Sequence, residues 1–89
     1  MTTYIVTFDI KDPKRMEAFT AKLKEEHSWC PIHENAYAIR TEKTAAELRL
    51  ILAKITIIAD RVFVIKTGKE AVWINTYSDR NSDWLKKYL

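Results

Sequence analysis

The residues best suited to chemistry lie in one short segment near the N-terminus. Asp9 is a lone acid at the end of an apolar, alternating run, and Lys14 and Arg15 follow where a helix is expected to begin. The helix macrodipole disfavours cations in a first turn, so these two residues need another role. With the free N–H groups of that turn they predict a phosphate site. Solvated surface residues are the more common explanation of this spacing.

Other reactive or aromatic residues have structural explanations that compete with functional ones. Histidines such as His27 and His33 can act as general acid or base, but a helix end and a turn explain them better. Cys30 is the only cysteine, which excludes an internal disulfide and a multi-cysteine zinc site; we expect a half-buried apolar residue. Trp73 and Trp84 can stack on bases. We expect instead that they fill a dimer interface and anchor the last helix.

The elements that position these residues follow from hydrophobic periodicity and capping signals. Strands are predicted near residues 3–10, 28–32, 35–41, 60–67 and 71–76, and helices near 13–26, 44–57 and 82–89. Asp12 followed by Pro13 is typical of a helix start, and Thr44 with Glu47 forms a capping box. Ser82 or Asn81 is expected to cap the last helix.

Length and composition limit the architecture. The 89 residues, 47% hydrophobic and 30% charged, suffice for one domain spanning 1–89. The net charge of +3 permits an acidic partner such as nucleic acid without requiring one. No run of about 18 apolar residues and no signal peptide is apparent. With a single cysteine, this predicts a cytoplasmic protein.

The element order predicts an α+β fold of the ferredoxin-like type: β-α-β-β-α-β, then a fifth strand and a short C-terminal helix. Tyr4, Val6 and Phe8 should face the helices, while Ile5 and Asp9 lie on the other sheet face. Because a monomer rarely exposes such an apolar face, we expect a homodimer that joins two sheets, with segment 71–76 pairing to the partner's sheet edge.

The segment Tyr4-Ile5-Val6-Thr7-Phe8-Asp9-Ile10-Lys11-Asp12-Pro13-Lys14-Arg15 carries a family resemblance. It is similar to the CRISPR-associated small ferredoxin-like family, the smaller partner in the spacer-acquisition complex. The layout of residues 3–76 matches that family as well. The segments Ser28-Trp29-Cys30-Pro31-Ile32 and Ser82-Asp83-Trp84-Leu85 resemble a divergent SinR-like branch of stand-alone proteins. VapD-type toxin ribonucleases share the fold.

The resemblance implies a homodimer in which two copies of Asp9 face each other near the two-fold axis. In the family this aspartate is assigned to a divalent metal, with Mg²⁺ the expected ion, and some members cut RNA or DNA. It therefore implies a Mg²⁺-dependent endonuclease, an endoribonuclease first of all, with Asp9 as catalytic metal ligand. From their charge and position at the helix start, we expect Lys11, Lys14 and Arg15 to contact the nucleic acid. Other members act as non-catalytic scaffolds. A binding module for nucleic acid or a protein partner, or a VapD-type ribonuclease, thus stays open.

Overall fold

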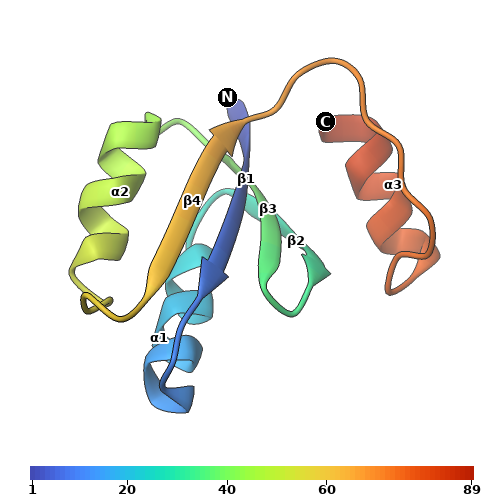
Figure 1. The fold of residues 1–89 in the computed structure, drawn as a ribbon. Coiled ribbons are helices and arrows are strands. Elements are labelled where there is room, and N and C mark those ends of the chain that lie inside the picture. The colour runs from blue at the N-terminus through green and yellow to red at the C-terminus, as the bar shows by residue number, and fades with distance from the viewer.

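The computed structural model describes residues 1–89 as an α+β fold with one antiparallel sheet of four strands and three helices (Figure 1). The elements in chain order are β1 (Thr2–Asp9), α1 (Pro13–Leu23), β2 (Ser28–His33), β3 (Ala36–Thr41), α2 (Ala45–Ala53), β4 (Arg61–Lys66) and α3 (Asp79–Tyr88). The strands lie in the order β2-β3-β1-β4, so β2 and β4 form the two edges. The predicted order β-α-β-β-α-β is confirmed for the first six elements.

Local signals explain where the helices begin. The Asp12 carboxylate accepts a hydrogen bond from the backbone N–H of Arg15 at 3.0 Å. Pro13 is the first residue of α1, a position whose N–H has no partner within the helix, so the missing N–H of proline costs nothing there. The predicted capping box at α2 is present: the Thr44 hydroxyl accepts the Glu47 N–H, and the Glu47 carboxylate accepts the Thr44 N–H.

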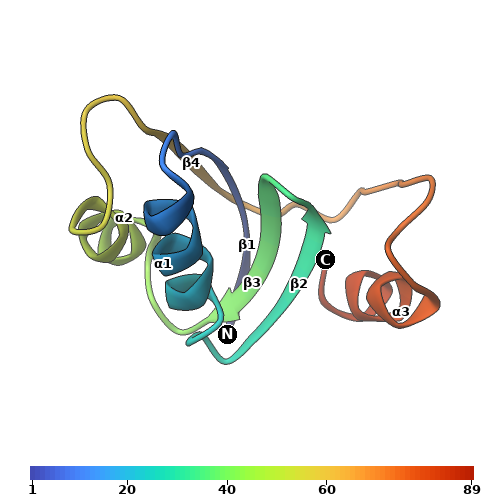
Figure 2. The ribbon, with the colours of Figure 1, turned by 90° about the horizontal axis from the view of Figure 1, so that it is seen from below.

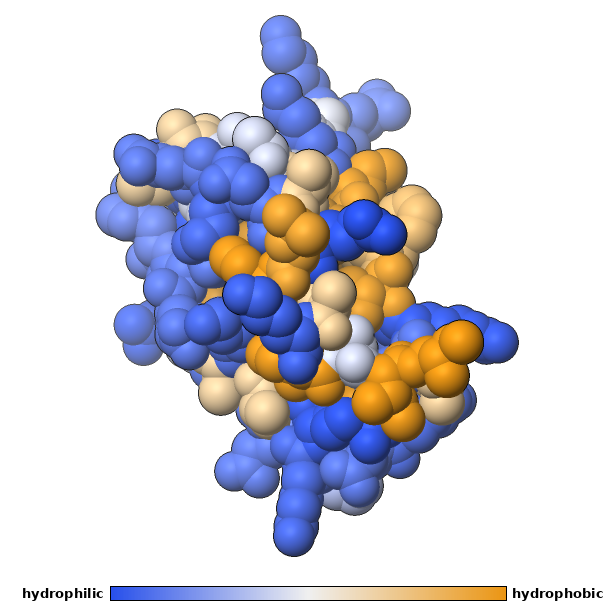
Figure 3. Space-filling view, turned by 90° about the vertical axis from the view of Figure 1, so that its left-hand side faces the viewer, coloured by the Kyte–Doolittle hydropathy of each residue, from blue (hydrophilic) through white to orange (hydrophobic).

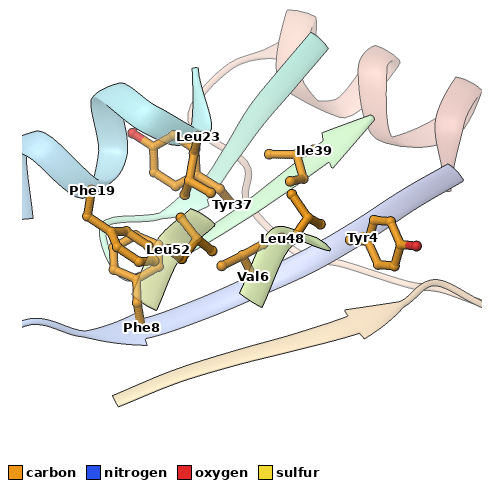
Figure 4. Packing of buried hydrophobic residues seen from close by; sticks show 9 residues of the cluster. All are labelled: Tyr4, Val6, Phe8, Phe19, Leu23, Tyr37, Ile39, Leu48 and Leu52. Carbon is orange, nitrogen blue, oxygen red and sulfur yellow. The ribbon is translucent and has the colours of Figure 1, made fainter. Parts of the chain in front are cut away.

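The main core lies between the sheet and the helices α1 and α2. Alternation along β1 sends every second side chain into it, as predicted from the sequence. Its members come from β1, α1, β3 and α2 (Figure 4): Tyr4, Val6, Phe8, Phe19, Leu23, Tyr37, Ile39, Leu48 and Leu52. The rings of Phe8 and Phe19 lie 4.8 Å apart between centroids, so the second half of α1 packs against the sheet.

The other face of the sheet is covered only in part. Helix α3 lies on this side, opposite α1 and α2, and packs over β2 and β3 (Figure 2). Leu85 is buried with Cys30 and Ala38, and the Tyr88 carbonyl accepts a hydrogen bond from the Thr3 hydroxyl at 2.8 Å. Cys30 is therefore fully buried rather than half-buried. The expectation that Trp84 anchors the last helix agrees with its packing against this cluster.

The half of this face built by β1 and β4 has no cover. Phe63 and Ile65 of β4 stand opposite Thr7 and Ile5 of β1 in the strand register. The two β4 side chains are 60% and 51% exposed. Hydrophobic side chains also reach the surface on the side where α2 lies, scattered among charged ones (Figure 3). None of the three helices is long and apolar enough to cross a membrane.

The fifth strand predicted over residues 71–76 is not formed. Val72 and Ile74 are 94% and 89% exposed, and no strand pairs with them. The alternating pattern was a poor guide because a strand forms only where it pairs with a neighbouring strand, and this segment does not pair with the free edge of β4 in its own chain. Trp73 instead packs toward α3, with its indole N–H on the Ser82 hydroxyl at 3.0 Å, and Asn75 adopts a left-handed φ of 58°.

Element boundaries also differ from the predicted ones. Helices α1 and α2 end at Leu23 and Ala53, earlier than the predicted residues 26 and 57. Helix α3 starts at Asp79 instead of 82, because Ser78 is the N-cap and its hydroxyl accepts the Asn81 N–H. Ser82, the predicted cap, is thereby free to accept from Trp73.

Candidate nucleic-acid interface

Asp9 is the last residue of β1 and lies on the sheet face opposite α1 and α2, in the half that α3 does not cover. In the strand register it stands opposite Arg61 of β4. Its carboxylate is 52% exposed and pairs with the Lys11 ammonium, with 2.7 Å between Oδ2 and Nζ. The predicted site residues Asp9 and Lys11 therefore lie together as an exposed ion pair at the end of the strand.

Asp9 borders a shallow hollow at this end of the sheet. Thr7, His33, Arg61 and Phe63 are among the other residues that line it. The imidazole Nδ1 of His33 accepts the backbone N–H of Asn35 at 3.2 Å, so in the neutral ring Nε2 carries the proton. The hollow thus gathers the Asp9 carboxylate, the Arg61 guanidinium, several hydrogen-bonding side chains and the Phe63 ring. Arg61 and Phe63 were not identified from the sequence, because their proximity to Asp9 depends on strand register.

Arg15 forms a structural ion pair with Asp60. Its Nε and Nη2 donate to the two oxygens of Asp60 at 2.9 and 3.0 Å. The Asp60 side chain has no exposed surface, and its oxygens also accept the backbone N–H groups of Lys11 and Ile57. Asp60 thereby joins the start of α1 to the loop that precedes β4.

The charges of this pair stabilise each other. Hydrogen bonds from the Arg15 guanidinium, and next from the Lys11 N–H, hold the pKa of the Asp60 carboxyl far below its usual range. The hydrogen bond to Asp60 likewise raises the pKa of Arg15. Sequence reasoning missed Asp60 because 45 residues separate it from Arg15. The available signal was the unfavourable position of a cation in the first turn of a helix.

Lys14 is exposed on the first turn of α1 and forms no ion pair within the chain. The cap of this helix already carries the Asp12 carboxylate, which occupies the Arg15 N–H. The predicted phosphate site at the helix start is therefore partly filled by an acid of the chain itself. Lys14 and Lys11 keep ammonium groups that solvent reaches, whereas the Arg15 guanidinium is committed to Asp60.

A single chain does not provide a magnesium site around Asp9. No group of three or more His, Cys, Asp or Glu residues is placed to hold a metal ion. Asp9 contributes one carboxylate, and Lys11 already occupies one of its oxygens. Mg²⁺ is usually held by one or two carboxylates together with substrate phosphates and water. A site of that kind here requires a second copy of Asp9, a bound phosphate, or both.

The two edges of the sheet differ in their capacity to pair with another chain. At β2, Pro31 lacks an N–H, and its carbonyl accepts the side-chain amide of Asn81 at 3.1 Å. At β4, no element of the chain covers the outer edge. The uncovered edge adjoins Phe63 and Ile65, so the apolar patch and the free strand edge are continuous.

Comparisons with known proteins give the chain no family. No protein-family model matches it, and no curated protein matches it either.

Proposed function

We propose that the protein is a homodimeric, nucleic-acid-associated protein of the ferredoxin-like fold, similar to the CRISPR-associated small family and its SinR-like branch. The fold assignment is supported by the element order and by the antiparallel strand order β2-β3-β1-β4. The observation that carries the functional proposal is the uncovered half of the sheet, where Asp9 lies at the end of a strand beside exposed Phe63.

The second copy covers this half of the sheet. Phe63 and Ile65 form an apolar patch of a kind that isolated small domains seldom expose, and the free β4 edge lies beside it. Segment 71–76 supplies Val72 and Ile74, which find no partner in their own chain. We place that segment along the β4 edge of the partner, so that the segment's apolar side chains and the partner's apolar patch are buried together.

Nucleic acid binds at the end of the sheet where Asp9 lies. Lys11, Lys14 and Arg61 offer positive charge there, and the net charge of +3 favours a polyanion. Arg15 adds little to this charge, because the carboxylate of Asp60 neutralises its guanidinium. In the dimer these cations are doubled, which suits a backbone contact that does not depend on sequence.

Two activities fit this arrangement. In the first, the protein is a Mg²⁺-dependent endonuclease, acting on RNA before DNA. The two Asp9 carboxylates would then hold the metal, which supplies charge neutralisation at a phosphate and an activated water. The protein's own contribution is to position the two carboxylates and to hold the phosphate with Lys11 and Lys14.

The second activity is non-catalytic binding of nucleic acid or a protein partner. The Asp9–Lys11 ion pair favours it, because an ammonium 2.7 Å from the carboxylate competes with a metal ion. A VapD-type ribonuclease is a variant of the first activity in a different biological setting. The buried, unpaired thiol of Cys30 accords with a cytoplasmic location for any of these.

One experiment separates these activities. Purified protein is incubated with labelled single-stranded RNA and duplex DNA, in Mg²⁺ and in EDTA, and cleavage and binding are measured in parallel. The endonuclease predicts cleavage that EDTA abolishes and that Asp9→Asn removes while binding remains. Asp83→Asn, at an exposed aspartate of α3, is the matched control and leaves cleavage intact. Binding without cleavage supports the scaffold, and absence of both refutes the proposal.

A further inference from the structure

A second polar hollow lies between the edge strand β2 and the first half of α3. Its volume is about 510 Å³, within the range of small-molecule sites. Residues from both elements line it, including His27, Ser28, Arg80, Asn81 and Trp84. None of these residues belongs to the interface around Asp9.

The α3 wall of this hollow presents a cation and an aromatic ring side by side. Arg80 and Trp84 are four residues apart on the helix, so their side chains are neighbours on one face. Arg80 is exposed and forms no ion pair within the chain. The Trp84 ring is held by Tyr88, with 5.0 Å between the ring centroids. A fixed aromatic surface beside a free guanidinium is suited to a flat, anionic ligand.

The helix is rigidly attached to the strand at this point. The side-chain amide of Asn81 donates to the Pro31 carbonyl at 3.1 Å, and its Oδ1 accepts the Ser78 hydroxyl at 2.9 Å. Because Pro31 has no N–H and its carbonyl is already bonded, the edge is closed to a peptide that would add as another strand. The hollow therefore selects against an extended peptide as its ligand.

The strand side of the hollow contains an unexplained polar atom. The Ser28 hydroxyl is buried and has no hydrogen-bond partner, and no other buried side-chain nitrogen or oxygen in the chain lacks one. Native proteins rarely leave such a group unpaired unless water or a ligand completes it. His27, exposed at the start of β2, adds a second donor at the same rim.

From these features we infer that the hollow between β2 and α3 binds a nucleotide unit, with the base against Trp84 and the phosphate on Arg80 and His27. The unit is either a free mononucleotide or one residue of a single-stranded nucleic acid. In the second case the inference rests on the proposed function and names its substrate as single-stranded.

The test uses uridine 5′-monophosphate, a uridine dodecamer and inorganic phosphate, titrated into the intact protein by calorimetry. The three tryptophan indole N–H signals are followed by NMR. We expect nucleotide and oligomer to shift the Trp84 signal more than that of Trp73, whose indole is bonded to Ser82. Binding of the oligomer alone indicates a site for single strands, and binding of both indicates a site for the free nucleotide as well.

Variants assign the binding to this hollow. Arg80→Gln should weaken binding about 10-fold to 100-fold, the loss of a charge-assisted contact, while Arg49→Gln on α2 should have no effect. Ser28→Ala should weaken binding without lowering Tm, because it removes a buried hydroxyl that has no partner in the chain.

Three results would overturn the inference. Phosphate that binds as tightly as the nucleotide would leave only an anion site. An oligomer that binds equally well to wild type and Arg80→Gln would place the nucleic acid elsewhere, and the proposed function would stand. If neither oligomer nor nucleotide binds, the inference fails, and the nucleic-acid part of the proposed function fails with it for single strands.

Discussion

Replacing Ile74 with serine should weaken the proposed dimer strongly while sparing the fold of each chain. The side chain is 89% exposed in the single chain, so the substitution removes little intramolecular packing. Burying an isoleucine against a partner contributes about 1.5–3 kcal/mol. A two-fold interface contains it twice, which gives ~3–6 kcal/mol and raises the dimer Kd by a factor of ~10²–10⁴.

Sedimentation velocity over a dilution series measures that Kd directly. Leu50→Ser is the matched control, because Leu50 is 63% exposed on α2 and plays no part in the proposed contact. Thermal unfolding of the diluted proteins should give equal Tm values for Ile74→Ser and wild type. An Ile74→Ser protein that dimerises like wild type would refute the assignment of segment 71–76 to the interface. A lower Tm in the monomer would show that Ile74 packs within its own chain.

Three further predictions concern the charged residues. Hydrogen bonds to Arg15 and the Lys11 N–H depress the folded pKa of Asp60, so its contribution to stability should be full above about pH 4 and be lost as the pH falls below that. Asp60→Asn should lower Tm at neutral pH and flatten the acid limb of a Tm–pH profile; an unchanged profile would contradict the ion pair. Mg²⁺ should raise the Tm of wild type but not of Asp9→Asn, whose metal-free dimer should be at least as stable because two carboxylates no longer repel. If Mg²⁺ has no effect and Asp9→Asn is less stable, Asp9 is a structural acceptor. Lys14→Glu should weaken nucleic-acid binding and reduce the slope of log affinity against log salt by about 1, and an unchanged slope would make Lys14 a surface residue only.

The sequence predicted those parts of the fold that depend on local pattern. Alternation along β1 correctly separated Tyr4 and Val6 from Ile5, because side-chain direction in a strand has a period of two residues. The capping signals at Asp12 and Thr44 were equally local and are both present.

The failures arose where the outcome depends on distant partners. Segment 71–76 has the composition of a strand, but it does not pair with the free β4 edge of its own chain. The start of α3 was ambiguous because Ser78 and Ser82 are both competent caps, and tertiary contact with Trp73 selects between them. The ion pair between Arg15 and Asp60 joins residues 45 positions apart, so no local sequence pattern predicts it.

For the site itself, the sequence predicted the location of Asp9 and Lys11 but not their pairing. It also gave no indication that Arg61 and Phe63 lie beside Asp9, since β1–β4 register decides this. The hollow between β2 and α3 was equally hidden, because it exists only once α3 docks on the side of the sheet away from α1 and α2.

The most direct test of the proposed dimer is whether two copies of Asp9 come together across the uncovered half of the sheet. Asp9→Cys is treated with a short bis-maleimide at micromolar protein concentration, and the products are separated by mass. We expect a covalent dimer in high yield, whereas wild type, whose only thiol is the buried Cys30, stays uncrosslinked. A Leu50→Cys variant that crosslinks as readily as Asp9→Cys, or an Asp9→Cys protein that remains a single chain, would contradict it.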